Sequence, residues 1–184
     1  MDSPFMVAFA EGLTASDMCV GRFEFSYMQR RRAEGTKRPP DQAPKLMECW
    51  TDVIAEVRGT MPKGGKLIIG GKSMGGRMAS LVADDAGVDG LVCLGYPFHP
   101  PGRPEKTRTD HLEGLKTPTL IVQGTRDTMG GTEAVAGYSL SSKIELQWLE
   151  DGDHSFKPRK KSGRTEDQNW QEGITGVASF VKGL

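Results

Sequence analysis

The sequence predicts an α/β protein built from three layers, with helices on both faces of a mainly parallel sheet. Three short apolar segments bounded by glycine or proline have the composition of buried strands, at 66–70, 91–95 and 119–124. Segments with a helical spacing of apolar residues alternate with these strands, which is typical of parallel sheets joined by crossover helices. A chain of 184 residues is long enough for one such domain, which we expect to span residues 1–184.

The N-terminal part of the chain should contain two helices and one strand. Ser3-Pro4 is a favourable cap and first turn, so a helix is expected from there to Leu13. Cys19–Phe25 alternates apolar and charged residues and is expected to form a half-exposed edge strand. A polar loop over Gln29–Ala43 then leads to an amphipathic helix over Leu46–Val57.

The rest of the chain alternates strands and helices. Apolar residues from Met74 to Val82 lie on one helical face, and this helix should end near Gly87. The remaining elements are a strand at 91–95, a proline-rich loop at Pro97–Thr109, a short surface helix carrying His111, strands at 119–124 and 144–149, and a closing helix over Trp170–Val181.

Ser73 lies where the first buried strand passes through glycines into a helix. The segment Gly71-Lys72-Ser73-Met74-Gly75 fits Gly-x-Ser-x-Gly, a sharp turn that exposes a serine hydroxyl at the end of a sheet. The pattern alone is weak in a chain with 24 glycines, but here a buried strand precedes it and an amphipathic helix follows. Ser73 is therefore the predicted nucleophile of a serine hydrolase.

The same segment partly matches a phosphate-binding loop, Gly-x-x-x-x-Gly-Lys-Ser. Gly71-Lys72-Ser73 fits its end, but Lys66 stands where the first glycine is required. The residues between them are typical of a strand rather than of a loop with open backbone N–H groups. Nucleotide binding is therefore a minor hypothesis.

A candidate acid and a candidate base follow Ser73 in the chain. Asp127 comes directly after a buried strand, and His154 lies in the loop between the last strand and the last helix. The carboxyl ends of parallel strands meet at one edge of a sheet, so these three side chains should lie together. A base must contact the serine hydroxyl while a carboxylate fixes its other ring nitrogen. Weaker candidates for that carboxylate, both close to the histidine in sequence, are Asp151 and Asp153.

Composition and charge argue against several function classes. The formal net charge is zero, so no overall field favours nucleic acid or a membrane surface. No apolar run is as long as a bilayer span, and the first residues lack the basic and apolar parts of a signal peptide. Cys19, Cys49 and Cys93 lie in apolar segments without metal-ligand spacing, which indicates buried free thiols and a cytoplasmic protein. We expect no metal and no organic cofactor.

These segments resemble the α/β-hydrolase superfamily over essentially the whole chain. The similarity is greatest to the compact, lid-less branch near the dienelactone hydrolases, including small bacterial hydrolases related to the hydrolase-like subunit of a nuclear histone-acetyltransferase complex. The segments that carry it are Arg22-Phe23-Glu24-Phe25, Gly71-Lys72-Ser73-Met74-Gly75-Gly76-Arg77, Gly95-Tyr96-Pro97-Phe98-His99-Pro100-Pro101-Gly102, Gln123-Gly124-Thr125-Arg126-Asp127 and Gly152-Asp153-His154-Ser155.

The resemblance implies a triad of Ser73, His154 and Asp127, with the backbone N–H of Met74 as one oxyanion donor. In relatives, a further strand ending in a His-Gly-rich loop supplies the second donor, and this sequence begins at about the point where that loop would end. The expected fold is therefore a minimal α/β-hydrolase fold that lacks the usual first strand and oxyanion loop, apparently shortened at its N-terminus. The missing strand would lie between the Cys19–Phe25 strand and the Ser73 strand.

The leading functional hypothesis is hydrolysis of a small ester or thioester through an acyl-enzyme on Ser73. The alternative is a weak or inactive hydrolase-fold protein that binds or scaffolds a partner, because a fold does not fix a function. Loss of one oxyanion donor costs about 100- to 1000-fold in rate, which favours that alternative. Candidate substrate-binding residues are Lys72, Tyr96, His99 and Arg126.

Two basic loops bear on the charge of the substrate. If they surround the site, they favour an anionic substrate; two solvated loops balanced by acids elsewhere are the more ordinary interpretation. The loops contain Arg30, Arg31, Arg32, Lys37 and Arg38 after the first strand, and Lys157, Arg159, Lys160, Lys161 and Arg164 after His154.

Overall fold

The computed structural model describes residues 2–35 and 39–184. Lys37 and Arg38 of the first basic loop lie outside the described residues. In chain order the elements are α1 (Pro4–Thr14), α2 (Ser26–Glu34), α3 (Ala43–Thr60), β1 (Ile68–Lys72), α4 (Met74–Ala86), β2 (Gly90–Leu94), α5 (Asp110–Glu113), β3 (Thr119–Gly124), α6 (Thr132–Val135), β4 (Ile144–Leu149), the 3-10 helix η1 (Lys160–Ser162) and α7 (Glu166–Gly183).

The strands form a four-stranded sheet in the order β1-β2-β3-β4, and every neighbouring pair is parallel. Cys93 of β2 lies opposite Ile121 of β3, which in turn lies opposite Leu146 of β4. All residues of β2 and β3 are buried, as expected for central strands covered on both faces. The predicted α/β class with a mainly parallel sheet is confirmed.

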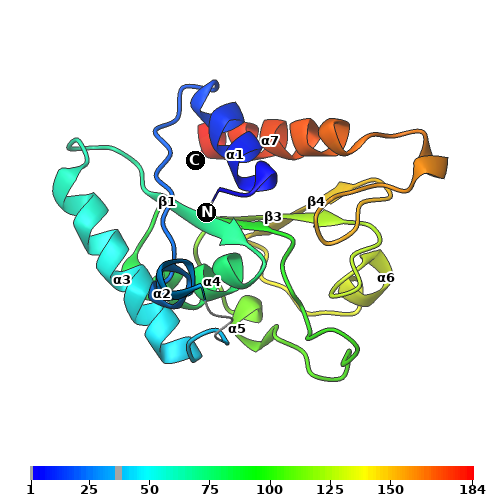
Figure 1. Cartoon of the computed structure of the whole chain (residues 1–184), viewed down its shortest axis with the longest axis horizontal. Helices are drawn as coiled ribbons and strands as arrows, with labels where there is room; N and C mark the ends of the chain where they lie inside the picture. Colours follow the sequence, from blue (N-terminus) through cyan, green and yellow to red (C-terminus); the bar gives the residue numbers. More distant parts are fainter. Residues whose placement is uncertain (1, 36–38) are drawn as a thin grey trace.

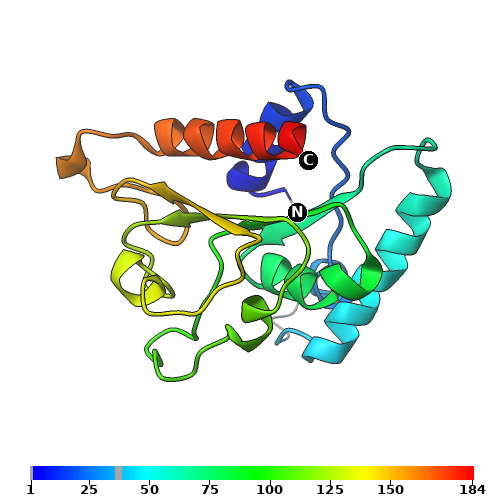
Figure 2. The same ribbon diagram turned by 180° about the vertical axis from the view of Figure 1, so that it is seen from behind.

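Helices cover both faces of this sheet and give the three layers (Figure 1). On one face α1 and α7 lie side by side, and on the other lie α2, α3, α4 and α5, as the view from behind also shows (Figure 2). The core beneath α1 and α7 includes Phe5, Phe9, Val122, Leu149 and Ile174. The core beneath α3 and α4 includes Trp50, Ile54, Met78, Ala79 and Leu91.

The parallel arrangement brings three connecting segments to the same edge of the sheet. Ser73 follows β1 directly, Asp127 follows β3 by three residues, and His154 follows β4 by five. Because the strands are parallel, all three residues leave from carboxyl ends, which is where α/β proteins place their reactive groups.

Residues 18–25 do not form a strand, so the expected edge strand is wrong. Within the described part of the chain, β1 is the outer strand of the sheet and this segment makes no ladder with it. Its aromatic side chains pack on α3 instead: the Phe23 ring lies 4.6 Å from the ring of Trp50 and 5.7 Å from that of Phe25. The alternation in sequence therefore reflects aromatic packing against a helix.

The segment predicted as a loop over Gln29–Ala43 is helical in its first part, where it belongs to α2. This helix is polar, with only Tyr27 buried, so it carries no apolar periodicity by which it could be recognised. Ion pairs hold it in place, between Arg30 and Asp41 at 2.8 Å and between Arg32 and Glu24 at 3.0 Å.

Two smaller expectations also change. Cys19 is exposed, because its segment lies on the surface rather than in the sheet, whereas Cys93 is buried and Cys49 partly buried. His111 lies on the short helix α5 as expected, but its ring turns inward and lies 2.8 Å from Ser80 Oγ. Among the described residues, no helix is both long enough and apolar enough to cross a lipid bilayer.

Candidate active site

Ser73 lies at a sharp turn between the end of β1 and the start of α4. Its backbone has φ 53° and ψ −118°, a conformation that residues other than glycine rarely adopt. The Ser73 N–H donates to the Leu94 carbonyl at 2.9 Å, which holds the turn against β2. Strand and helix pass closely because residue 76 is glycine; a Cβ on Gly76 would lie 2.5 Å from the Gly71 carbonyl oxygen. The turn therefore has the strand–turn–helix context that the Gly-x-Ser-x-Gly pattern requires.

The side chains of Ser73, His154 and Asp127 form a continuous hydrogen-bonded row. His154 Nε2 lies 2.8 Å from Ser73 Oγ, and His154 Nδ1 lies 2.7 Å from Asp127 Oδ2. Asp127 is only 3% exposed, while 25% of the His154 side chain is exposed. An imidazole held in this way can take the hydroxyl proton on one nitrogen while the carboxylate accepts the N–H of the other.

Asp127 is fixed by donors at the end of β3. Gln123 Nε2 donates to Asp127 Oδ2 at 2.8 Å and to the Gly130 carbonyl at 3.1 Å, while its Oε1 accepts the Tyr96 N–H at 2.7 Å. The Met129 N–H donates to Asp127 Oδ1 at 2.9 Å. Gln123 is fully buried in an otherwise apolar strand, and that contrast is the sequence signal from which its role could have been inferred.

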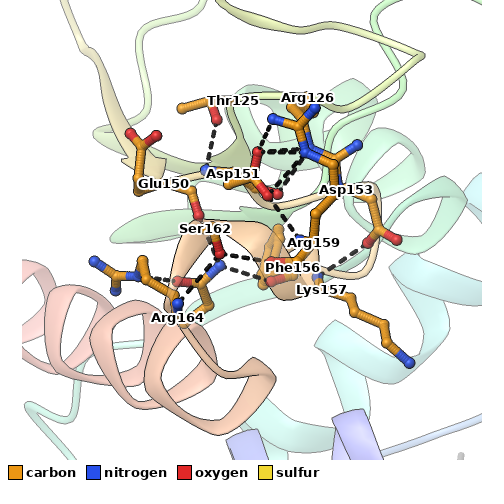
Figure 3. Close-up of polar contacts among 11 residues, drawn as sticks. Thr125, Arg126, Glu150, Asp151, Asp153, Phe156, Lys157, Arg159, Ser162 and Arg164 are labelled. Atoms are coloured by element: carbon orange, nitrogen blue, oxygen red, sulfur yellow. Dashed lines mark hydrogen bonds and ion pairs between the residues drawn. The ribbon is translucent and has the colours of Figure 1, made fainter.

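The loop that carries His154 is fixed by Asp151, which lies between Arg126 and Arg159 (Figure 3). The Asp151 carboxylate accepts the Arg159 N–H at 2.7 Å and bonds from the Arg159 guanidinium, and its Oδ1 lies 3.0 Å from Arg126 Nε. Arg126 Nε also donates to the Asp151 carbonyl at 3.0 Å. Hydrogen bonds from Arg159, with the neighbouring charge of Arg126, lower the pKa of Asp151 to about 2. The segment of the acid and the segment of the base are thereby joined next to the Asp127–His154 contact.

Lys72 joins the strand of Ser73 to the same loop. Its Nζ donates to the His154 carbonyl at 2.6 Å and lies 4.9 Å from the centre of the Phe5 ring and 5.9 Å from that of Phe156. Burial lowers the pKa of Lys72 to about 8, against the opposing effect of the Asp127 and Asp153 carboxylates.

Comparison with known proteins gives a consistent result. A family model described as an alpha/beta hydrolase domain matches residues 1–182. The chain belongs to the alpha/beta hydrolase family. This membership and the fold support a hydrolase.

Solved structures resemble this alpha/beta hydrolase over nearly its whole length. An alpha-beta serine hydrolase homologue from Coxiella burnetii superposes with a TM-score of 0.66 at 17% identity, covering 97% of this chain and 76% of that one. A lid-less serine hydrolase from Xanthomonas campestris gives 0.63 at 18% identity, covering 96% and 75%. An esterase domain from Rhodothermus marinus gives 0.65 at 16% identity, covering 96% and 78%. At these identities the likeness concerns the fold.

The remaining residues predicted from the sequence are the oxyanion donor and the substrate-binding residues of this alpha/beta hydrolase site. Met74 is the first residue of α4, where a helix has no carbonyl of its own for the backbone N–H. Tyr96 is fully buried and its hydroxyl donates to the Arg108 carbonyl at 2.9 Å, so it does not face a substrate. His99 is 5% exposed, and its Nδ1 lies 2.9 Å from the Pro100 carbonyl. Arg126 is engaged with Asp151 as described above.

Several basic residues of the two loops pair with neighbouring acids. Arg159 pairs with Asp151, and Arg164 pairs with Glu172. Arg30 and Arg32 of the first loop have the partners already named. Paired side chains of this kind match the more ordinary interpretation of solvated, balanced loops.

A second serine–histidine pair occurs on the α4 side of the sheet. Ser80 Oγ donates to the Arg77 carbonyl at 2.8 Å and lies 2.8 Å from His111 Nε2. In the described part of the chain no carboxylate bonds to the His111 ring, and Ser80 is only 2% exposed, so this pair lacks both the orienting acid and the access of Ser73. No group of three or more possible metal ligands occurs within the described residues.

Proposed function

We propose that this protein hydrolyses a carboxylic ester or thioester through an acyl-enzyme on Ser73. The observation that carries the proposal is the row of two short hydrogen bonds from Asp127 through His154 to Ser73. The esterase domain among the similar structures adds support for an ester substrate.

The first half of the reaction transfers the acyl group to the enzyme. His154 Nε2 takes the Ser73 hydroxyl proton as Oγ attacks the carbonyl carbon. The developing oxyanion is stabilised by the Met74 N–H at the start of α4, and Asp127 stabilises the imidazolium. When the tetrahedral intermediate collapses, His154 returns its proton to the leaving alcohol or thiol. The second half repeats these steps with water as the nucleophile and releases the acid.

The proposal is tested by active-site labelling and by ester hydrolysis. A fluorophosphonate probe should label the parent protein on Ser73, and Ser73→Ala should abolish labelling and lower kcat by roughly 10⁴- to 10⁶-fold. Ser155→Ala is the matched control, because Ser155 is exposed beside His154 and its side chain takes no part in the row. Equal labelling of Ser73→Ala and the parent would contradict the proposal.

A binding protein on a hydrolase fold is the second candidate. It is favoured by the oxyanion site, for which we identify one donor, Met74, among the described residues, whereas acyl transfer ordinarily uses two. If this candidate is correct, Ser73→Ala should keep full biological activity, and no ester or thioester should be turned over by the parent.

A further inference from the structure

The backbone carbonyl groups of the loop that carries His154 all accept hydrogen bonds. In this loop, residues 150–156, each carbonyl oxygen has a donor among the described groups. Loops at a protein surface commonly leave such groups to water, so a loop in which protein donors bind every carbonyl is closely held. The donors from outside the loop are the N–H and Nε of Arg126, Nζ of Lys72, Nε1 of Trp170 and Nδ2 of Asn169.

Asn169 of α7 binds both ends of this loop with one side-chain amide. Its Nδ2 donates to the Glu150 carbonyl at 3.1 Å and to the Phe156 carbonyl at 2.8 Å, and its Oδ1 accepts a bond from Arg164 Nε at 2.8 Å. An asparagine amide has two N–H donors and one oxygen, so both donors and the oxygen of this buried side chain are in use. The bond from Arg164 also fixes which end of the amide faces the loop.

The loop is strained at the two places that Asn169 binds. Asp151 has φ 53° and Phe156 has φ 68°, left-handed conformations that cost free energy in residues other than glycine. Such conformations persist where the surrounding contacts hold them. One of the carbonyls bound by Asn169 belongs to Phe156 itself, and the other, that of Glu150, directly precedes Asp151. Without this amide we expect the loop to relax at both ends.

His154 lies between these two fixed points and is positioned by them. Its ring and its carbonyl pack on the bare backbone of Gly95, where a Cβ would lie 2.9 Å from the His154 carbonyl oxygen and 3.4 Å from its Nδ1. One position further along, the Ser155 carbonyl accepts a bond from Trp170 Nε1 at 3.1 Å. The imidazole therefore has little freedom unless the loop itself moves, and a small shift of the loop would lengthen its 2.7 Å contact with Asp127.

We propose that Asn169 is a positioning residue of the active site, whose amide keeps the loop of His154 in the shape that aligns the imidazole between Asp127 and Ser73. Its polar groups are all engaged with the loop and with Arg164, so it acts through the backbone of residues 150–156 and not on the substrate. This role deepens the hydrolase function proposed above, and its kinetic consequences rest on that function. Loss of the amide donors should change the state of the imidazole, and not only the stability of the fold.

The imidazole gives the first test, without any chemistry. With a carboxylate bonded to Nδ1, neutral His154 should carry its proton on Nδ1, and proton–nitrogen NMR of the ring distinguishes this tautomer from the Nε2–H form. Asn169→Leu keeps a similar volume and removes both donors, so it should lose the Nδ1–H form of His154. A spectrum of His154→Gln identifies the signals.

Asn169→Asp is the second variant, and it carries the test if Asn169→Leu does not fold. It keeps the shape of the side chain and the acceptor for Arg164 Nε, and it replaces only the donor group. The same loss of the Nδ1–H form is expected in this variant.

Two controls separate positioning from stability. Gln171→Leu also replaces an amide by leucine, but at an exposed position of α7, and it should keep the parent tautomer. Ile54→Ala removes buried methyl groups from α3, on the opposite face of the sheet (Figure 1), so it should lower the Tm and still keep the parent tautomer. A folded Asn169 variant with the parent tautomer overturns the proposal, and so does an equal loss of that tautomer in Ile54→Ala.

Kinetics give the second test. On any ester that the parent turns over, both Asn169 variants should lower kcat by roughly 10- to 100-fold while KM changes less than about threefold, because a misplaced base affects the transition state and not ground-state binding. Gln171→Leu and Ile54→Ala, measured below their Tm, should keep kcat within about threefold of the parent. A change confined to KM, or an equal loss of kcat in Ile54→Ala, overturns the proposal.

The two proposals fail separately. A parent protein that hydrolyses no ester contradicts the proposed function, but the tautomer of His154 still tests the role of Asn169. Ester hydrolysis through Ser73 that continues at the parent kcat in folded Asn169 variants overturns the role of Asn169 and leaves the proposed function standing.

Discussion

The ammonium group of Lys72 lies 2.6 Å from the carbonyl oxygen of His154, so the residue before Ser73 holds the loop that carries the imidazole. The contact spans 82 positions of the chain and brings a cation into a site that also contains Asp127. Because burial lowers the pKa of Lys72 from 10.5 to about 8, the protonated form is less favourable in the folded protein than in the unfolded chain.

The pH dependence of stability should therefore carry a contribution from Lys72. Between pH 8 and 10.5 the unfolded chain binds more protons at this residue than the folded protein does, so the free energy of unfolding rises with pH in this interval. In Lys72→Met this contribution is absent. Between pH 8 and 10.5 the free energy of unfolding of the parent should therefore rise by roughly 1–2 kcal/mol more than that of the variant, allowing for solvent screening. Urea unfolding at several pH values measures the difference. Lys63→Met is the control, because Lys63 is exposed, and its free energy of unfolding should change with pH as that of the parent does. The same pH dependence in Lys72→Met and in the parent would contradict the prediction.

The fold was predictable because its signals are local. Buried parallel strands are continuous apolar runs, and the Gly-x-Ser-x-Gly turn marks a change from strand to helix within a few residues. Parallel strands require their carboxyl ends to meet at one edge, and this predicts from the sequence that Ser73, Asp127 and His154 lie together. The strand predicted near residues 18–25 is wrong because alternation indicates only that one face of a segment is apolar. Here that face packs on α3 and not in a sheet.

The groups that support the site were not predictable from local patterns. Lys72 and His154, like Arg126 and Asp151, are far apart in sequence, and their contacts depend on how two loops meet. Helix α2 could not be predicted from the sequence because it is polar and has no apolar face.

A methyl group at position 76 should displace the turn of Ser73. In Gly76→Ala the new Cβ would lie 2.5 Å from the Gly71 carbonyl oxygen and 3.3 Å from the Cys93 backbone, so α4 must move away from β1. We expect a loss of roughly 2–3 kcal/mol in the free energy of unfolding, and loss of labelling at Ser73. Gly75→Ala is the matched control one residue earlier, where a Cβ meets nothing within 4 Å. It should be neutral or more stable by up to about 1 kcal/mol, as for other glycines replaced in helices. Equal effects of the two substitutions would contradict this account of the turn.

Removing the charge of Asp151 should loosen the loop of His154. Its pKa is lowered to about 2, so its contribution to stability is present above the ordinary carboxyl range and is lost as the pH falls toward 2. Asp151→Asn should therefore lower the Tm at pH 7, and the two proteins should become alike near pH 2. With the loop displaced, kcat should fall by roughly 10- to 100-fold while KM changes less.

The control for Asp151→Asn is Glu150→Gln, which removes one carboxylate from the adjacent, exposed position. It should leave the Tm, its pH dependence and kcat close to those of the parent, because exposed charges contribute little. A similar loss in both variants would mean that overall charge, and not the contact with Arg126 and Arg159, holds the loop.

Gln123 should be required both for stability and for the orientation of Asp127. In Gln123→Leu the Tyr96 N–H and the Gly130 carbonyl lose buried partners, and Asp127 Oδ2 loses its donor beside His154. We expect the free energy of unfolding, measured in urea, to fall by about 2–4 kcal/mol, and kcat to fall on any ester that the parent turns over. Gln147→Leu on the adjacent strand β4 is the control. Among the described residues the Gln147 side chain makes one hydrogen bond, from its Nε2 to the Glu172 carbonyl at 2.9 Å, and its Oε1 has no partner. That substitution should cost about 1 kcal/mol or less and leave kcat unchanged, because its hydrogen bonds do not connect to the Asp127–His154 pair.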